Sequence, residues 1–559
     1  MTAKPDDAPH PTSTVNRIES LVAQTTPAAH QPASERRKSR VSVSPVVWIM
    51  MAAVAARAWL LFRTPYVPGI NGAYYPVQAR ALLERGALAI PDLPLTFHLH
   101  AALAWSLAKV TGMAQADAIM WAVKLCDAVL PPLVAWPVFV LVRRWARSRG
   151  QGDAVPLAAA ALVCLASTPF RIVGDLQKNS LALVWLAMLA ATLHCWLEAP
   201  TPRRGVAVLA TLLLLGLTHV GVLGAALVLL AVVVPVFMAR RRGFARWRQV
   251  LPWMGAGVLL LVLTAAFVFW RFDPTRIHRL ALAFTNPAAF SFDGGQMPIR
   301  PGSAMYVARW VAWLAFALAV GPALSIAWRR RNELPAADVA LVAGGAFAVL
   351  AMTGPYFSMD KSVRFYLIAL LPAIIVAAFS ALHVATAWRR WCLLGLVLLV
   401  GIGGTVRSWP LGGQAVLSDA AMRELQSLVQ YIPQPNRTLI VTEHGAEWWG
   451  AWFLRTRVAQ PDALRPEDWQ HYDSILFLDI KSGLQANMFA GGGPPPGRGR
   501  GPGPGDSPLA RPDRGARPMM SVPIPPDAEV LHDGATLRLA RIATPPDFVR
   551  SRDSHALPR

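Results

Sequence analysis

The sequence predicts an α-helical polytopic membrane protein with about eleven transmembrane helices and a small C-terminal α/β domain outside the membrane. The first reason is composition: 54% of the 559 residues are apolar and 15% are charged, whereas a soluble chain carries about 25% charged residues. The second is a mean hydropathy of +0.38. The third is a series of apolar runs of spanning or near-spanning length, at residues 44–63, 118–142, 154–168, 179–197, 205–219, 221–238, 250–270, 306–328, 338–353, 365–387 and 392–406.

Basic residues gather directly beside these runs, at 143–149, 203–204, 240–248, 329–331 and 389–390. The positive-inside rule places such loops in the cytoplasm. We therefore attribute the net charge of +22 to membrane orientation and expect no nucleic-acid partner. A further apolar stretch at residues 95–112 is ambiguous. If it crossed the membrane, all of those basic loops would lie outside, so we predict a helix that lies at the interface or re-enters the membrane.

The resulting topology has a cytoplasmic N-terminus in a bacterial-type inner membrane and a periplasmic C-terminal part. Residues 1–43 are predicted to form a disordered basic tail without a cleavable signal peptide. Residues 44–407 form the transmembrane domain, and residues 408–490 form the α/β domain. Residues 491–526 are a flexible Gly- and Pro-rich insert, and residues 527–559 supply a strand hairpin and the tail of the periplasmic domain.

The C-terminal part carries strand patterns at residues 437–441 and 474–479 and a short helix pattern at 446–454. A hairpin is predicted at residues 527–542, with its turn at Asp533-Gly534. Between the first strand and the helix, residues 443–449 read Glu-His-Gly-Ala-Glu-Trp-Trp. We interpret this corner as structural or as a recognition surface, because no metal-ligand spacing such as His-Glu-X-X-His is present.

The loop after the first apolar run has a distinctive order of residues. Residues 69–75 read Gly-Ile-Asn-Gly-Ala-Tyr-Tyr, an amphipathic helix with Ala79-Arg80 and Gly86 follows, and residues 91–95 read Pro-Asp-Leu-Pro-Leu. This order resembles the GT-C superfamily of membrane glycosyltransferases, which includes oligosaccharyltransferase catalytic subunits and protein mannosyltransferases. The resemblance covers about residues 44–406. It implies a GT-C-like fold and sugar transfer from a polyprenyl-phosphate donor.

The resemblance also implies an acidic residue in the first outer loop that acts as base or orients the acceptor. The matching residue here is Asn71, and an amide cannot accept a proton at neutral pH. The role therefore shifts to Asp92, for which the alternative is a turn residue between two prolines. Asp175 matches a second acidic site. It could bind a divalent metal such as Mg or Mn, or it could simply cap the next helix.

Cations and hydroxyls near these acids are candidates for binding the donor. Arg171 and Lys178 flank Asp175 and could orient a pyrophosphate-like head group. Arg364 matches an arginine that the resemblance implies holds the lipid phosphate, and its alternative is an interfacial anchor. Tyr74 in the first loop and His219 at the end of an apolar run complete the binding candidates, although a lone histidine there is more often an interfacial hydrogen-bonding group.

One charge lies inside the first predicted span. Because a charge in a membrane is costly, Arg57 requires a polar cavity or partner. Asp127 and Lys124, near the outer end of the second span, are expected to form a similar network.

Two functions from different classes remain open at this point. The leading hypothesis is a membrane glycosyltransferase that transfers a hexosyl or pentosyl group from a polyprenyl-phosphate donor to a periplasmic acceptor. The alternative is a non-catalytic GT-C-like protein that binds lipid-linked glycan or organises envelope assembly. Both have a lipid-linked sugar and membrane lipids as partners. A transporter is less favoured, because no pair of Gly- or Pro-broken helices recurs in two matching halves.

Overall fold

The computed structural model describes residues 44–165, 173–242, 304–384 except 356 and 358, 415–481 except 465 and 466, and 527–542, with single positions 259, 263, 266, 267, 270, 271 and 524. The chain divides into two compact units, Met1–Ser44 and Pro45–Arg559. The tail predicted at residues 1–43 lies outside the described residues, and so does the insert at 491–526 except for residue 524. The helices and strands of the described residues belong to the second unit.

Five helices of the described part are long and apolar enough to cross a membrane, so the protein is a polytopic membrane protein. They are Gln115–Arg147, Gln177–Glu198, Val220–Arg241, Arg309–Arg329 and Arg364–His383. Three shorter apolar helices are Pro45–Leu61, Ala154–Leu165 and Ala336–Met352. The predicted run at 392–406 lies outside the described residues, and that at 250–270 lies almost wholly outside them. The total of about eleven spans stays a prediction.

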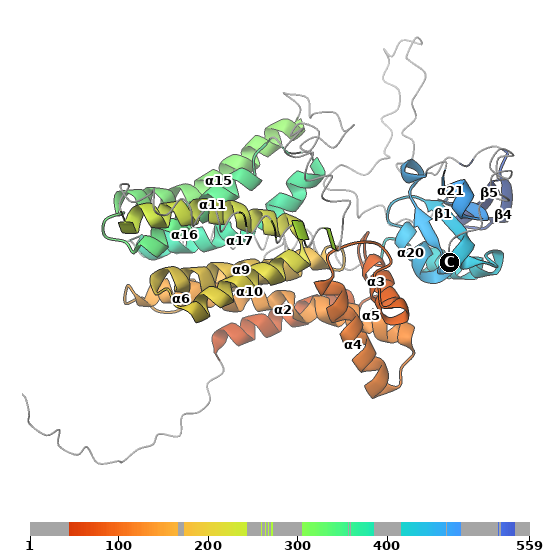
Figure 1. Ribbon diagram of the computed structural model, residues 1–559, viewed down its shortest axis with the longest axis horizontal. Coiled ribbons are helices and arrows are strands. Elements are labelled where there is room, and N and C mark those ends of the chain that lie inside the picture. The colour runs from red at the N-terminus through yellow and green to blue at the C-terminus, as the bar shows by residue number, and fades with distance from the viewer. Residues whose placement is uncertain are drawn as a thin grey trace, which may run out of the picture. The chain divides into compact units, whose positions relative to one another are not determined.

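The elements of the helical part follow the predicted apolar runs closely. In chain order they are α2 (Pro45–Leu61), α3 (Tyr74–Arg85), α4 (Leu95–Thr111), α5 (Gln115–Val129), η1 (Pro131–Val134), α6 (Ala135–Arg147), α7 (Ala154–Leu165), α9 (Gln177–Glu198), α10 (Pro202–Thr218), α11 (Val220–Arg242), α15 (Ala304–Arg329), α16 (Ala336–Met352) and α17 (Met359–His383). Figure 1 shows α11, α15, α16 and α17 lying side by side, with α9 and α10 next to each other.

Small residues allow these helices to approach closely. A Cβ added at Gly344 in α16 would lie 2.8 Å from the carbonyl oxygen of Leu229 in α11. Such backbone proximity is the usual basis of helix packing in membranes, where lipid offers as much apolar contact as another helix does. One apolar cluster joins α2, α6, α7, α9, α10, α11, α15, α16 and α17.

The helix predicted at residues 95–112 is present as α4, and Gly112 ends it in a left-handed conformation (φ 70°). It is not among the candidate spans found in the described part of the chain. Figure 1 shows α4 inclined steeply to α2, α9 and α10. It packs on α3 and α5, and the expectation that it does not span the membrane stays a prediction.

The basic segments of the helical part meet at one end. Arg144 forms an ion pair with Glu198, Arg149 lies 3.5 Å from a carboxylate oxygen of Asp338, and Arg149 Nε donates to His383 (3.0 Å). The ends of α6, α9 and α17 and the start of α16 are therefore together. The first loop and the residues before α9 belong to the opposite ends of these helices. This arrangement agrees with the charge parity of the predicted topology, whose orientation stays a prediction.

Five strands follow the helices in sequence: β1 (Thr438–Thr442), β2 (Arg457–Ala459), β3 (Ser474–Ile480), β4 (Glu529–Asp533) and β5 (Leu537–Ile542). The sheet order is β2-β1-β3-β5-β4. Strand β1 pairs in parallel with β2 and β3, and β5 pairs antiparallel with β3 and β4. All five β1 residues are buried, as expected for a central strand of a parallel pair. The predicted strands, and the hairpin turning at Asp533, agree with these bounds.

Short helices accompany the sheet, and one of them connects β1 to β2 as the crossover that parallel strands require. That helix is α20 (Glu447–Leu454), which agrees with the predicted helix at 446–454. The others are α19 (Asp419–Ser427), α21 (Asp468–His471), η4 (Leu428–Tyr431), η5 (Pro435–Arg437) and η6 (Pro461–Ala463).

The sheet region and the first loop share one apolar core. Buried residues of α3, α4 and α5 belong to the same cluster as those of α19, α20, β1, β3 and β5. Gly69 forms a parallel bridge with Ala415. The guanidinium of Arg80 in α3 donates to the carbonyls of Ala451 and Trp452 and lies 4.7 Å above the Trp452 ring. These contacts hold α20 against the first loop, and this positions the site described next.

Candidate functional site

Asp175 is held by the first loop. Its Oδ1 accepts hydrogen bonds from the backbone N–H of Asn71 (2.7 Å) and from the Asn71 amide (2.9 Å). Its backbone carbonyl accepts from the Tyr75 hydroxyl (3.1 Å). In the described part of the chain, Oδ2 has no hydrogen-bond partner. Asn71 is therefore a donor that orients a carboxylate, a role its amide can fill although it cannot act as a base.

Two glycines bring these segments together. Gly69 has φ 94°, and a Cβ there would lie 2.6 Å from the Cβ of Asp175. Gly174 has φ 78°, and a Cβ there would lie 2.7 Å from Pro68 Cγ. The alternative interpretation of Asp175 as a helix cap is wrong, because α9 begins after Leu176 without a capping side chain. Its carboxylate is bonded to Asn71 instead.

Asp92 lies in a second, buried part of the site and is only 2% exposed. One oxygen accepts from the Tyr74 hydroxyl and the Lys178 ammonium, and the other accepts from the backbone N–H of Leu93 (2.7 Å). The ammonium lies 5.6 Å from the Tyr74 ring and 5.5 Å from the Phe97 ring, within cation–π distance. Burial, together with the charge of Asp92, raises the Tyr74 pKa well above 10, so this phenol stays protonated and donates a hydrogen bond to Asp92.

A buried ion pair supports the site. Arg57 Nη2 lies 2.6 Å from Asp127 Oδ1, and Arg57 Nε donates to the Asp127 carbonyl (2.7 Å). Asp127 Oδ2 accepts from the backbone N–H of Gly174 (2.7 Å), next to Asp175. Lys124 donates to the carbonyls of Thr64 (2.6 Å) and Pro65 (2.9 Å). The partner expected for Arg57 is thus Asp127, and the pair fixes the turn that carries Asp175.

The corner before α20 lies against the first loop. A Cβ at Gly445 would lie 3.2 Å from Ile70 Cγ2, and the Trp448 and Tyr74 rings are 4.8 Å apart. His444 Nδ1 lies 2.7 Å from Glu447 Oε1, and the backbone N–H of Gly445 donates to Glu447 Oε2. Sequence reasoning did not place this corner in the site. The His-X-X-Glu spacing was visible, but its contact with the first loop arises from tertiary packing.

The electrostatics of His444 connect the corner to two predicted site residues. The hydrogen bond to Glu447 raises the pKa of His444 above 6.5 against the effect of burial. The charge of Asp175 raises it further, while the charge of Arg364 in α17 lowers it. Asp175 and Arg364 therefore both act on His444 through space.

The sequence-predicted site residues divide into four groups. The structure brings one group together: Asn71, Tyr74, Asp92, Asp175 and Lys178. Arg364 is exposed, and its charge lowers the pKa of His444. His219 lies between α10 and α11, where its Nδ1 accepts from the backbone N–H of Val222 (3.2 Å), so its observed contact is with the start of α11. Arg171 is outside the residues that the structure describes.

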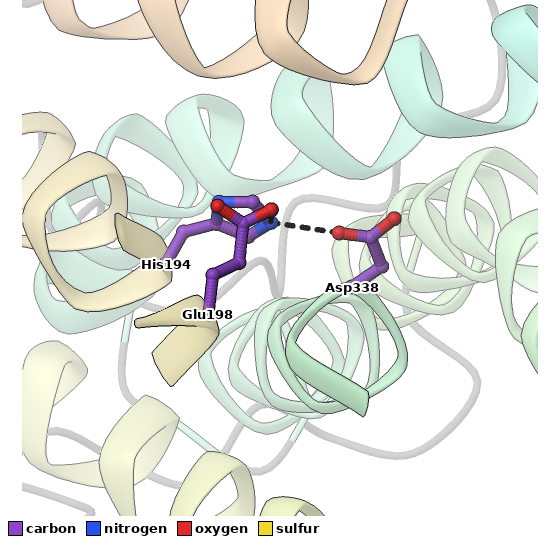
Figure 2. A group of neighbouring side chains, drawn as sticks. All are labelled: His194, Glu198 and Asp338. Atoms are coloured by element: carbon purple, nitrogen blue, oxygen red, sulfur yellow. Dashed lines mark hydrogen bonds and ion pairs between the residues drawn. The ribbon is translucent and has the colours of Figure 1, made fainter. Parts of the chain in front are cut away.

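A different cluster could in principle hold a metal: His194, Glu198 and Asp338, whose ligand atoms all lie within 4.8 Å of one another. Figure 2 shows His194 facing Asp338, with Nε2 2.7 Å from Oδ1. The Trp145 indole also donates to Asp338 (2.9 Å), and Arg149 and Arg144 neutralise the two carboxylates. With both charges already paired, the cluster is a network that joins α6, α9 and α16.

A metal was also expected at Asp175. Among the described residues, the cluster of Figure 2 is the only group of three or more His, Cys, Asp or Glu ligands close enough to hold an ion. Asp175 is not part of it, and Lys178 is paired with Asp92. The divalent metal expected at Asp175 stays a prediction, and no catalytic step below uses one.

The fold and the site define a polytopic helical membrane protein with a polar site where the first loop, the start of α9 and residues 443–448 meet. No family model matches the sequence, and no curated protein matches it. The chain is similar to two solved structures of ArnT from Cupriavidus metallidurans, one in the apo state and one bound to undecaprenyl phosphate. Each is 13% identical and covers 89% of this chain and 97% of that chain, with TM-scores of 0.49 and 0.47. At these values, residue roles have to come from the geometry of this chain.

Proposed function

We propose that the protein is a membrane glycosyltransferase that transfers a sugar from a polyprenyl-phosphate donor to a periplasmic acceptor. The observation that carries the proposal is the attachment of Asp175 to Asn71 at the loop that resembles the GT-C motif. This attachment uses Oδ1 of Asp175 and leaves Oδ2 available. Aromatic rings of Tyr74, Phe97 and Trp448 lie in the same region. The sheet region and this site belong to the periplasmic side, and the basic end belongs to the cytoplasm.

The donor phosphate requires cations that remain charged beside it. Arg364 is the best candidate because a guanidinium binds two phosphate oxygens at once. Lys178 is held by Asp92 next to Tyr74, and its positive charge attracts a phosphate that binds nearby. Arg171 belongs to this proposal as a further cation. Asp175 accepts a hydrogen bond from a sugar hydroxyl and so orients the donor.

The reaction needs no covalent intermediate with the protein. The acceptor oxygen forms a bond to the anomeric carbon while the bond from that carbon to the phosphate oxygen breaks. The electron pair of the broken bond remains on the phosphate, and polyprenyl phosphate leaves. Cations aligned with the phosphate before the reaction stabilise the negative charge that develops on it.

Sugar transfer from a labelled polyprenyl-phosphate donor in membranes tests the proposal. Asp175→Asn is expected to lower the rate at least about 100-fold, a typical loss when a charged catalytic contact is removed. Asp117→Asn is the matched control, because Asp117 is an exposed residue in the first turn of α5. Transfer at equal rates by wild type and Asp175→Asn would remove Asp175 from the chemistry.

The second candidate is a non-catalytic protein that binds lipid-linked glycan. It is favoured by the engagement of Asp92 with both Lys178 and Tyr74, which leaves that carboxylate less able to take a proton. Binding of the lipid donor without release of polyprenyl phosphate would support this candidate. Measurable release would exclude it.

A further inference from the structure

The proposed function leaves one part of the site without a role. Residues His444 and Glu447 form a hydrogen-bonded pair on the corner before α20. Glu447 is 2% exposed, and its two oxygens are fixed by His444, by the Gly445 N–H and by the Gln460 amide (3.2 Å). A carboxylate held in this way fixes the orientation of the imidazole that it binds.

The free nitrogen of this histidine is accessible. The His444 side chain is 48% exposed although Glu447 is buried. With Nδ1 directed to Glu447, the lone pair of a neutral imidazole is on Nε2. Within the described part of the chain, Nε2 has no hydrogen-bond partner. His444 therefore combines a fixed ring with an available basic atom.

The pair also borders the donor site. Gly445, the neighbour of His444, packs on Ile70, which precedes Asn71. Trp448, the neighbour of Glu447, packs edge-on against Tyr74. The first loop thus contacts the corner on one side and Asp175 on the other.

The site lacks an obvious base at the position where the GT-C resemblance implies one. Asn71 cannot take a proton, and Asp92 is engaged by an ammonium and a phenol. Asp175 remains, but a carboxylate is intrinsically a weaker base than an imidazole. An imidazole with its own carboxylate partner is the stronger base of the site.

We propose that His444, oriented by Glu447, is the general base that removes the proton of the acceptor, and that this acceptor is an alcohol, such as a sugar or amino-acid hydroxyl. The inference rests on the proposed function. The acceptor O–H proton passes to His444 Nε2, the acceptor oxygen bonds to the anomeric carbon, and the phosphate leaves with the electron pair of the broken bond. The imidazolium then releases its proton to water.

The need for a base selects the acceptor class. A hydroxyl is a poor nucleophile until its proton is removed, so its transfer rate depends on a base. A phosphate group is already ionised at neutral pH and gains little from one. The pair therefore fits an alcohol acceptor better than a phosphate.

The pH dependence gives a distinctive signature. A base must be unprotonated, so activity is lost as the pH falls through the pKa of His444. Because Glu447 raises this pKa, wild type should lose activity at a higher pH than an unassisted histidine would. Glu447→Gln removes the anion and should move the acidic limb of the profile to lower pH.

The experiment measures transfer from the labelled polyprenyl-phosphate donor to an alcohol acceptor in membranes between pH 5 and 9, for wild type, His444→Gln, His444→Ala and Glu447→Gln. His444→Gln should lower kcat by about 100-fold to 10,000-fold, as expected when a general base is lost. Its thermal unfolding and its donor binding should not change. Added imidazole should restore part of the activity of His444→Ala. His471→Gln is the control, since His471 is exposed and ends α21.

The possible outcomes separate the two proposals. If wild type transfers sugar but His444→Gln has an unchanged kcat and an unchanged acidic limb, the general base is overturned and the glycosyltransferase stands. A loss in His444→Ala that imidazole does not restore, accompanied by a lower unfolding temperature, also overturns it in favour of a structural role. If wild type transfers no sugar, the proposed function fails and the inference fails with it.

Discussion

The Lys178 ammonium and the Asp92 carboxylate form an ion pair across 86 residues of sequence, with side chains only 12% and 4% exposed. The pair connects α9 to the segment before α4. Because neither charge has much access to water, each depends on the other for its solvation. The ion pair therefore links the stability of this region to the position of a cation at the site.

Removing one partner should cost more than removing both. Lys178→Met leaves a nearly buried carboxylate without its cation, and we expect a loss of about 3 kcal/mol in the free energy of unfolding. Asp92→Asn should lose a similar amount, whereas the double variant should recover part of the loss. The measurement is a double-mutant cycle by thermal unfolding in detergent. Additive losses, with a coupling below about 0.5 kcal/mol, would contradict the pair's dependence on each other.

Gly69 should be sensitive to a single methyl group. Gly69→Ala adds a Cβ 2.6 Å from the Cβ of Asp175 at a φ of 94°, so the turn and the carboxylate must both move. The variant should lose sugar transfer as severely as Asp175→Asn. Gly86→Ala is the matched control: its φ is also positive, but nothing lies within 4 Å of the added atom. It should lose only about 1–2 kcal/mol of stability and keep its activity. If Gly69→Ala and Gly86→Ala transfer sugar at equal rates, the contact of the added Cβ with Asp175 does not affect the activity.

The helices and strands were largely predictable because their pattern is local. Strand β1 lies at 438–442 where the strand pattern predicts 437–441, and α20 begins one residue after the predicted helix. The helix at residues 95–112 is present as α4, and its separation from the spans by the parity of basic loops stays a prediction. These features depend on hydropathy and charge over short stretches, which a single sequence displays directly.

The site was predictable only in its components. The chemistry of Asp92, Asp175 and Lys178 suggested their use, but not that Lys178 pairs with Asp92 rather than with its neighbour Asp175. From the sequence, Asn71 was interpreted as the loss of a base. In the structure, its amide donates a hydrogen bond to Asp175. His444 was assigned to a corner that is structural or a recognition surface, and not to the site, because its proximity to Ile70 depends on packing between segments more than 300 residues apart. Such pairings come from tertiary structure, which local patterns do not encode.

Arg57 and Asp127 should behave as a single unit inside the helical part. Arg57→Leu removes the cation from a carboxylate whose other oxygen binds the Gly174 N–H. We expect a loss of about 3–5 kcal/mol, together with a lower transfer rate because Gly174 precedes Asp175. Arg57→Leu with Asp127→Leu should regain stability but not activity, since Gly174 then lacks its acceptor. Unfolding in detergent and transfer assays on the same membranes check both parts. Recovery of activity in the double variant would show that Gly174 does not need Asp127.

Glu424 should set part of the acid stability of the sheet region. Burial raises its pKa, but hydrogen bonds from Thr536 and His532, and from the backbone of Thr536 and Leu537, outweigh this effect and lower the pKa from 4.5 to about 2. A group with a lowered pKa in the folded state stabilises that state fully above its unfolded pKa, and the contribution disappears as the pH falls toward the folded pKa.

Between about pH 4.5 and pH 2, wild type should therefore lose stability more steeply than Glu424→Gln does. Glu467→Gln is the control, because Glu467 is exposed beside α21, where its backbone carbonyl accepts from His471 and Gln470. Unfolding temperatures measured across this range test the assignment. Parallel curves for wild type and Glu424→Gln would mean that the hydrogen bonds to Thr536 and His532 do not favour the ionised carboxylate.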